Sequence, residues 1–243
     1  MIIDNHVHVG WFTDGYHTPR EVWDSAMAAG IDGMAVSSTS TCAELYKVVV
    51  RELRVLIKLG GERVRPILWL TPKMMRCRYA VPYMLHSKIP WQGIKMHWEA
   101  YKEWVNNKKL VVKGLEIARW LGVPVLFHTG NFASCHAGLF ADIIAENQDL
   151  TFVLAHGRPM DETLEVLRNN ENVFIDTSFM PAQDLQQLVD KSLVDRILFG
   201  TDFPINKVFY KDMDTVSYIQ NNIEMIKSVC GTSADEILSR CIY

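Results

Sequence analysis

Four histidines and one aspartate are the residues of this sequence whose types and spacing could do chemistry. His6 and His8 stand two residues apart in DNHVHVG, where the first apolar run ends. His128 ends a later run in VLFHTGN, His156 ends another in VLAHGRP, and Asp202 follows ILFGT. Imidazole nitrogens and carboxylate oxygens are donors that Zn²⁺ and similar cations accept. Buried imidazoles are costly unless paired or metal-bound, so a shared divalent cation would explain several of them at once, although a lone histidine is usually structural.

Eight short β-rich segments position these residues. Most carry Val, Ile, Leu or Phe without polar alternation, as strands buried on both faces do. Amphipathic, helix-like stretches lie between them, and this alternation indicates a parallel sheet with right-handed crossovers. The stretch 72–91 contains three prolines and is expected to be mostly loop. The predicted strands are 2–8, 33–38, 64–70, 92–97, 123–128, 151–156, 172–177 and 196–201.

Eight strand–helix units in 243 residues match the usual size of a (β/α)₈ barrel. We therefore predict an α/β fold of the TIM-barrel type, as a single domain over residues 1–243. A doubly wound open sheet is the alternative, but no GxGxxG follows the first strand. The C-terminal strand ends of a barrel meet on the face that carries active sites. His6 and His8 would both point into the mouth of the barrel, because side chains two apart on a strand share a direction.

Composition and charge favour a small-molecule partner. The formal charge is −3 and no Lys/Arg run is present, so neither a nucleic acid nor an anionic membrane is an expected partner. The five cysteines are odd in number and form no CxxC, which favours a reducing compartment. With no targeting segment and no apolar stretch of about 18 residues, we expect a cytoplasmic protein. The loops are short, and a neighbouring subunit of a homo-oligomer could complete the pocket.

Four segments together resemble the amidohydrolase superfamily of metal-dependent hydrolases: DNHVHVG, VLFHTGN, VLAHGRP and ILFGTDFP. The closest resemblance is to its amidohydrolase-2 branch, which includes the aminocarboxymuconate-semialdehyde decarboxylase type. The HxH pair alone is weak, because histidinol-phosphatase-type phosphoesterases and TatD-type nucleases begin in the same way. The ending GTDFP, with a histidine on each of the fifth and sixth predicted strands, makes the resemblance specific.

The resemblance implies a metal cofactor and a role for each matching residue. The cofactor would be a divalent cation, most often zinc with manganese or iron as alternatives, at one or two ions per chain. Asp202 would also take a proton from water as the general base. His156 would bind a second metal in a binuclear enzyme, or stabilise charge developing on the substrate in a mononuclear one. The implied ligands are His6, His8, His128 and Asp202.

Lys95 ends the fourth predicted strand in GIKMHWE. In binuclear relatives a lysine on this strand is carboxylated and bridges two metals, whereas in the amidohydrolase-2 branch it need not be modified. Lys95 would thus be a ligand only if carboxylated. A buried ion pair with Asp or Glu is the alternative.

Four further residues are candidates for substrate binding. Arg158 stands in HGRP, where a Gly-rich turn is usual in the family, and arginine forks match carboxylates or phosphates. Arg158 is therefore expected to bind an anionic substrate group, with a surface or helix-capping role as the alternative. The other three are Trp11, Trp98 and His97, although aromatic residues at such places more often serve packing.

We predict a metal-dependent hydrolase that activates water to cleave an amide, lactone or ester bond of a small molecule. The substrate can be an anion. A metal-dependent decarboxylase of an unsaturated or aromatic carboxylic acid is the alternative, since it needs nearly the same residues. A phosphoesterase or nuclease would want more ligands and a basic groove. A barrel that only binds would have no need of a general base such as Asp202.

Overall fold

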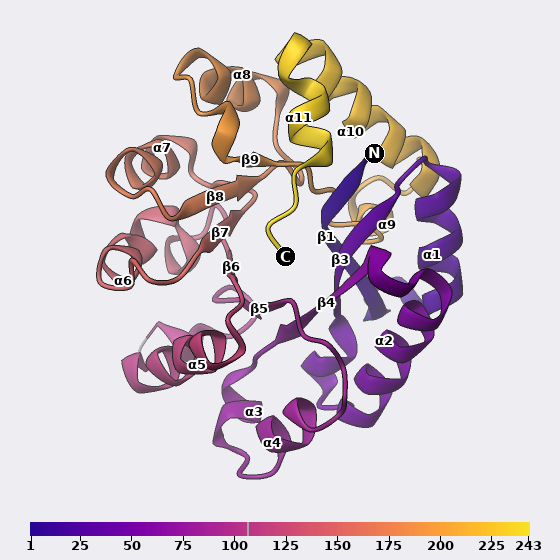
Figure 1. The fold of residues 1–243 in the computed structure, drawn as a ribbon, viewed down its shortest axis with the longest axis vertical. Coiled ribbons are helices and arrows are strands. Elements are labelled where there is room, and N and C mark those ends of the chain that lie inside the picture. Colours follow the sequence, from indigo (N-terminus) through magenta and orange to yellow (C-terminus); the bar gives the residue numbers. More distant parts are fainter. Residues whose placement is uncertain (106) are drawn as a thin grey trace.

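Eight parallel strands form a curled sheet in the computed structural model, which describes residues 1–105 and 107–243. Figure 1 shows the strands around a central axis, with helices outside them. A short ninth strand, β2 (Gly15–His17), pairs antiparallel with the end of β1 and was not predicted. The parallel strands are β1 (Ile3–Phe12), β3 (Gly33–Ser38), β4 (Val64–Trp69), β5 (Gly93–Met96), β6 (Val125–His128), β7 (Phe152–Ala155), β8 (Val173–Asp176) and β9 (Ile197–Leu198).

The sheet closes into a barrel where β1 meets the segment that follows β9. The amide of Asn5 donates to the carbonyl of Phe199 at 2.8 Å, and the amide of Asp202 donates to the carbonyl of His6 at 2.7 Å. The prediction of a (β/α)₈ TIM barrel is confirmed. The closure also brings Asp202 beside His6, although 196 positions separate them along the chain.

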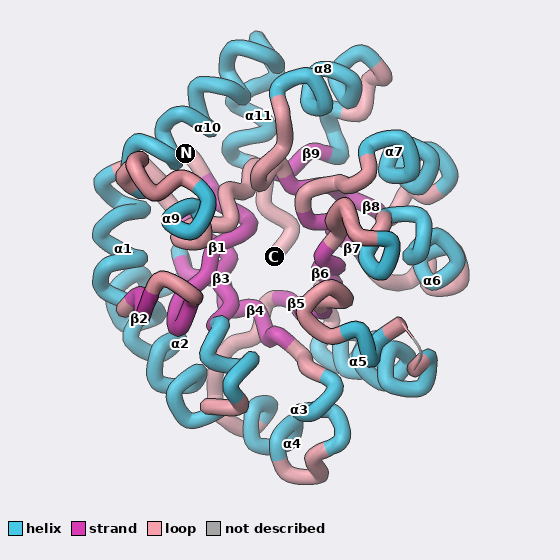
Figure 2. The backbone as a smooth tube through the Cα atoms, turned by 180° about the vertical axis from the view of Figure 1, so that it is seen from behind, coloured by secondary structure: helices cyan, strands magenta, loops and turns pink. Residues whose placement is uncertain are grey.

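Helices surround the barrel, as both backbone views show (Figures 1 and 2). The first begins where the sequence indicates, because Thr18 and Glu21 form a reciprocal capping box. No helix in the described part of the chain is long and apolar enough to cross a membrane. The helices are α1 (Pro19–Ala28), α2 (Tyr46–Gly60), α3 (Pro72–Arg76), α4 (Ala80–Leu85), α5 (Lys108–Leu121), α6 (Ala141–Ala145), α7 (Met160–Asn169), α8 (Ala182–Asp190), α9 (Asn206–Phe209), α10 (Thr215–Cys230) and α11 (Ala234–Ser239).

The stretch 72–91 holds two short helices, α3 and α4, so the prediction that it is mostly loop was wrong. Its prolines do not prevent helix formation, because Pro72 and Pro82 both stand in the first turn of a helix, where no amide donor is needed. The hydroxyl of Thr71 accepts a hydrogen bond from the amide of Met74 and caps α3. These two helices cover the barrel between β4 and β5.

Apolar side chains fill the interior of the barrel at the end opposite His6 and His8. Leu126, Val153 and Leu198 form one cluster, and Tyr243 from the last residues of the chain packs against it. The C-terminus lies at the barrel axis in both views (Figures 1 and 2). A Cβ atom on Gly93 would come within 2.9 Å of the Tyr243 ring. The barrel is therefore a packed core and not an open channel.

Candidate metal and active site

Three of the predicted metal ligands meet at the C-terminal face of the barrel. One side-chain donor atom from each of His6, His8 and Asp202 lies within 4.8 Å of the other two, and all three residues are buried. Oδ1 of Asp202 lies 2.9 Å from Nε2 of His8 and 3.4 Å from Nε2 of His6. Among the described residues, this oxygen receives no hydrogen bond of acceptable geometry. A buried carboxylate oxygen without a donor fits a cation-binding position.

The backbone of β1 is irregular where it presents the two histidines. Asp4 pairs with Met34 of β3, but the next pair joins Val7 to Val36, so β1 carries one extra residue. Such bulges re-aim side chains and are common next to active sites. The Nε2 atoms of both histidines face the amine of Lys95 in the barrel interior.

Lys95 occupies the space between the two imidazoles. Its Nζ lies 2.7 Å from Nε2 of His6 and 2.9 Å from Nε2 of His8, and it stands 4.7 Å from the centre of the Trp69 ring. Burial lowers the pKa of Lys95 to about 8, although the carboxylates of Asp202 and Asp176 oppose the shift. The position between the imidazoles is therefore one that accommodates a proton donor or a positive charge.

Asp176, at the end of β8, is a site residue that the sequence analysis missed. Its Oδ2 lies 2.9 Å from Nδ1 of His6, and its Oδ1 accepts hydrogen bonds from the amides of His156 and Ser178. Burial alone would raise the pKa of Asp176, but the His6 imidazole, the nearby His156 and the hydrogen bond from the Ser178 hydroxyl hold it well below its usual range. A carboxylate in this place fixes the ring so that Nε2 faces the candidate metal position. The available signal was its place at a strand end.

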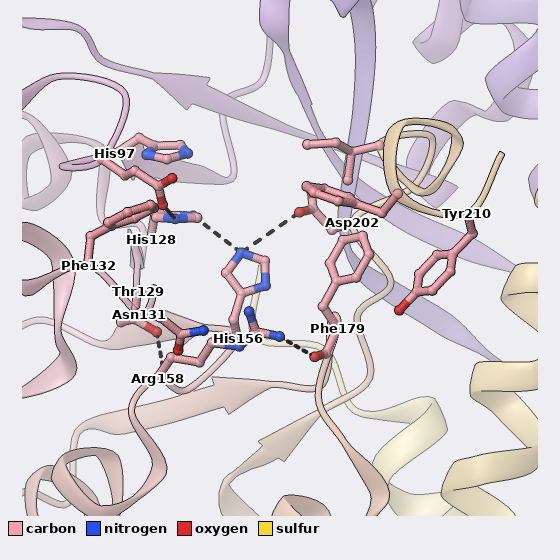
Figure 3. A pocket seen from close by; sticks show the side chains of 14 residues that line it. His97, His128, Thr129, Asn131, Phe132, His156, Arg158, Phe179, Asp202 and Tyr210 are labelled. Carbon is pink, nitrogen blue, oxygen red and sulfur yellow. Dashed lines mark hydrogen bonds and ion pairs between the residues drawn. The ribbon is translucent and has the colours of Figure 1, made fainter. Parts of the chain in front are cut away.

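The inner cluster consists of the buried residues His6, His8, Lys95, Asp176 and Asp202. His156 connects this cluster to the pocket. Its Nδ1 lies 3.0 Å from the carbonyl of Ser178, while its Nε2 lies 3.2 Å from Nδ1 of His128 and 3.8 Å from Oδ2 of Asp202 (Figure 3). Burial lowers the pKa of His156 to about 3, and His128 adds to the shift. His156 and Asp202 both have a left-handed backbone, with φ of 67° and 61°. Residues held in this conformation cluster at functional sites.

The structure places His128 one side chain further out than the other predicted ligands. Its Nε2 lies 2.9 Å from a carboxylate oxygen of Glu99, and its Nδ1 reaches the inner cluster only through His156. Its ring stacks on His97 at 3.6 Å between centroids, and His97 in turn stacks on Trp69. His97 thus lies in the wall of the site, wedged between two other rings.

The protonation states of the cluster suit a divalent cation. Burial raises the pKa of the Asp202 carboxyl, but the His6 imidazole, the hydrogen bond with His8 and the ammonium of Lys95 outweigh this effect and hold the pKa well below the usual range. Burial also lowers the pKa of four imidazoles, to about 4 for His8 and about 3 for His156. Ionised carboxylates and neutral imidazoles are the forms that bind metal. The four imidazoles are those of His8, His97, His128 and His156.

A pocket of about 490 Å³ opens above the inner cluster (Figure 3). Aromatic side chains form much of its rim, and polar groups from the site form its floor. It is lined by His97, Glu99, His128, Thr129, Gly130, Asn131, Phe132, His156, Arg158, Phe179, Asp202, Ile205, Phe209 and Tyr210. Of the four predicted substrate-binding residues, the structure brings His97 and Arg158 to this pocket.

The two tryptophans lie elsewhere. Trp98 is 3% exposed and packs in the core against Trp104, Phe127 and Phe140. Trp11 is 53% exposed and its ring lies beside that of Tyr16 on the β1–β2 hairpin. Neither residue lines the pocket, so the more common packing role of aromatic residues accounts for their positions.

Arg158 lies in the pocket wall just after β7. Its guanidinium donates one hydrogen bond to the carbonyl of Phe179, as the dashed line in Figure 3 marks. Its amide donates to the hydroxyl of Thr129 at 2.8 Å, which holds the turn in place. Since a guanidinium has five N–H donors, several remain for another acceptor.

A sequence profile of the family described as amidohydrolase matches residues 92–216, which include Lys95, His128, His156 and Asp202. No curated protein matches the sequence with significance.

Solved structures share the fold over nearly the whole chain. A probable 2-pyrone-4,6-dicarboxylic acid hydrolase from Acinetobacter baumannii, crystallised with citric acid, has a TM-score of 0.69 at 12% identity, with 98% of this chain and 95% of that chain covered. 4-Oxalomesaconate hydratase from Rhodopseudomonas palustris has a TM-score of 0.67 at 15% identity, with 98% and 93% covered. 2,6-Dihydroxybenzoate decarboxylase from Rhizobium has a TM-score of 0.61 at 14% identity, with 97% and 95% covered. These three named activities differ, so the shared barrel does not by itself select a reaction.

Proposed function

The chain belongs to the amidohydrolase family, and from this premise we propose that it is a metal-dependent hydrolase of small molecules, cleaving an amide, lactone or ester bond. The observation that carries the proposal is the meeting of His6, His8 and Asp202 within 4.8 Å of one another. Asp202 also lines the pocket, so the same carboxylate can face both a cation and a substrate.

His6, His8 and Asp202 would hold the cation, and their nitrogen and oxygen donors fit zinc best, with manganese or iron as alternatives. When bound, the cation would lower the pKa of water from about 16 towards about 7 and polarise a substrate carbonyl. His128 stays a proposed further ligand, although its ring now faces His156 and Glu99. Lys95 would bind a cation only as a carbamate, because a protonated amine has no lone pair to offer.

Asp202 would act as the general base. Its carboxylate is ionised, buried and open to the pocket, so it can take a proton from the attacking water and return it to the leaving group. His156 would stabilise negative charge that develops on the substrate as the tautomer protonated at Nε2, which lies between His128 and Asp202 beside the pocket. Its Nδ1 would then accept a hydrogen bond from the Ser178 hydroxyl, 2.9 Å away. Donors in such positions contribute about 3 kcal/mol to transition-state stabilisation.

Arg158 would bind an anionic group of the substrate. It lines the pocket, and the single bond to the carbonyl of Phe179 leaves other guanidinium donors free to pair with a carboxylate. The aromatic rim would pack against the substrate body. A small carboxylated ester, lactone or amide therefore suits the pocket best.

A metal-dependent decarboxylase of an unsaturated or aromatic acid is the second candidate. The rim favours it, because Phe132, Phe179, Phe209 and Tyr210 could enclose a planar acid. A dihydroxybenzoate decarboxylase also shares the barrel, which is a likeness of fold. Its chemistry needs the same cation and the same carboxylate.

The test combines metal analysis with product analysis. The purified protein, loaded with zinc, is offered a panel of carboxylated lactones, esters and amides together with a panel of aromatic and unsaturated acids. A new carboxylate without CO₂ supports the hydrolase, and CO₂ release supports the decarboxylase. Turnover that persists undiminished after chelation, or in the Asp202→Asn variant, would contradict both.

A further inference from the structure

The two ring nitrogens of His128 face different neighbours. Its Nε2 lies 2.9 Å from Oε2 of Glu99, in the loop that follows β5. Its Nδ1 lies 3.2 Å from Nε2 of His156, which is in turn 3.8 Å from Oδ2 of Asp202 (Figure 3). Because His128 is a proposed ligand of the cation, the nitrogen that carries its proton decides which atom can bind.

The carboxylate of Glu99 determines where that proton is. An ionised carboxylate has only acceptor atoms, so the contact at 2.9 Å requires an N–H at Nε2 of His128. Burial lowers the pKa of His128, and a neutral imidazole has a single N–H. The hydrogen bond from His128 lowers the pKa of Glu99, which keeps its carboxylate ionised. Nδ1 of His128 is therefore left with a lone pair.

The neighbouring histidine fits this assignment. A lone pair on Nδ1 of His128 accepts a hydrogen bond from His156 when the proton of His156 is on Nε2. Nδ1 of His156 then faces the Ser178 hydroxyl at 2.9 Å. The two neutral imidazoles thus supply one proton to each contact in the series from His156 to His128 to Glu99.

The loop after β5 fixes the His128 ring in two ways. The His97 ring stacks on it, with 3.6 Å between centroids and 16° between the planes, while Glu99 binds its edge. His97 is held in the same loop, because its Nδ1 accepts a hydrogen bond from the amide of Ala100 at 3.1 Å. Stacking sets the plane of the His128 ring, and the hydrogen bond sets its rotation within that plane.

Glycine at position 130 gives Glu99 and His128 the room to meet. A Cβ atom on Gly130 would lie 3.1 Å from Oε2 of Glu99 and 3.5 Å from Nε2 of His128. The φ angle of Gly130 is outside the left-handed region, so its backbone does not require glycine. On the same side, the thiol of Cys135 donates a weak hydrogen bond to Oε2 of Glu99 at 3.8 Å. Close packing therefore surrounds the contact between the carboxylate and the imidazole.

We propose that Glu99 is a positioning residue, whose carboxylate holds the proton of His128 on Nε2 and leaves Nδ1 facing the inner cluster as the metal-binding atom. The arrangement mirrors that of Asp176, which contacts Nδ1 of His6 and leaves Nε2 of that ring facing the cluster. Carboxylates in such places fix the tautomer and raise the basicity of a ligand imidazole. The inference rests on the proposed function, because it concerns a ligand of the same cation.

The assignment also links His128 to the proposed role of His156. In the structure, the Nε2–H of His156 is directed at Nδ1 of His128. Once that lone pair is given to a cation, it no longer accepts this hydrogen bond. The Nε2–H of His156 is then available to donate to a substrate oxygen in the pocket that His156 lines.

Cadmium NMR identifies the metal-binding nitrogens directly, because a ¹¹³Cd nucleus splits the signal of a ¹⁵N nucleus bound to it. The full chain is labelled with ¹⁵N-histidine, stripped of metal and loaded with ¹¹³Cd²⁺, and single histidine variants assign the signals. We expect coupling to Nδ1 of His128 and to Nε2 of both His6 and His8. The Nε2 of His128 should keep its proton in the loaded chain.

The same spectra separate this inference from the proposed function. Coupling to Nε2 of His128, or no coupling to His128 at all, would overturn the inference and leave the proposed hydrolase standing, provided that His6 and His8 are coupled. A loaded chain without coupling to His6 and His8 would contradict the proposed cation site, and the inference with it.

Two variants isolate the hydrogen bond from the charge, with zinc affinity measured by competition with a chelator. Glu99→Leu removes both and should weaken zinc binding by about 100-fold, whereas Glu99→Gln keeps an acceptor oxygen and should weaken it by about tenfold. Glu103→Leu is the matched control and should bind zinc as the unmodified chain does, because Glu103 is exposed and pairs with Arg76 outside the pocket lining.

Circular dichroism confirms that each of these variants is folded. Unchanged zinc affinity in Glu99→Leu would contradict the positioning role. Equal losses in Glu99→Leu and Glu99→Gln would contradict it as well, because the negative charge alone would then account for the effect.

Discussion

Two regions of this barrel use the same kinds of side chain in opposite settings. The inner cluster is buried and consists of His6, His8, Lys95, Asp176 and Asp202. The outer wall lines the pocket and consists of His97, Glu99, His128 and Arg158.

The difference between them is one of support. Inner-cluster residues stand on or beside strands, and the amide of Asp202 is bonded directly to the carbonyl of His6. Three of the four outer-wall residues, His97, Glu99 and Arg158, stand in the loops after β5 and β7. Geometry set by a strand ladder is difficult to shift, whereas geometry set by loops can adapt to a ligand. The inner cluster therefore suits chemistry, and the outer wall suits recognition.

The largest expected effect is at Asp202. Asp202→Asn should lower kcat by about 10²–10⁴-fold, because it removes the general base while keeping the size of the side chain. Steady-state kinetics on the substrate found by the panel measure this, and thermal unfolding checks that the fold is retained. A fall of less than about tenfold would move catalysis away from the inner cluster.

The next effect concerns the support of the inner cluster. Asp176→Asn should weaken metal binding by about 10–100-fold, since the amide no longer fixes the His6 ring as the carboxylate does. Competition with a chelator measures the affinity. Ser178→Ala is the comparison variant, because it keeps the carboxylate and removes a hydroxyl that donates to Asp176 and lies 3.3 Å from Nδ1 of His6. Equal metal affinities in Asp176→Asn and the unmodified chain would mean that the strand backbone alone fixes the orientation of the His6 ring.

A smaller effect is expected at the outer wall. Arg158→Met should raise KM about tenfold for anionic substrates and leave kcat nearly unchanged, because a charge-assisted hydrogen bond to the substrate is lost. Comparing a carboxylated substrate with its neutral amide isolates the charge. If Arg158→Met changes KM for neither the carboxylated substrate nor its neutral amide, Arg158 only holds the loop that contains Phe179.

The smallest effect is expected at Trp11. Trp11→Ala should change KM by less than about twofold and the free energy of unfolding by about 0.5 kcal/mol or less, since this ring is half-exposed and outside the pocket lining. Kinetics and chemical denaturation measure the two quantities. A large rise in KM would extend the recognition surface to the β1–β2 hairpin.

The order of the parallel strands was predicted well from the sequence, because strands buried on both faces consist of short runs of apolar residues. The sequence also indicated His6, His8 and Asp202 by their places at strand ends. It missed Asp176, which carries the same signal at the end of β8, because a single aspartate after an apolar run is common in strand-to-helix turns. The prediction for 72–91 was wrong, because prolines that stand in the first turn of a helix were interpreted as helix-breaking residues.

The number and order of the parallel strands and the face that carries the site were thus determined by the sequence alone, through local apolar patterning and right-handed crossovers, whereas the short antiparallel strand β2 was not predicted. Tertiary structure decided which strand-end residues touch. The bulge in β1 turns its histidines to Lys95, closure against β9 brings Asp202 to them, and His128 is drawn toward Glu99. These contacts join residues far apart along the chain, and no local pattern specifies them because they depend on how the whole sheet closes.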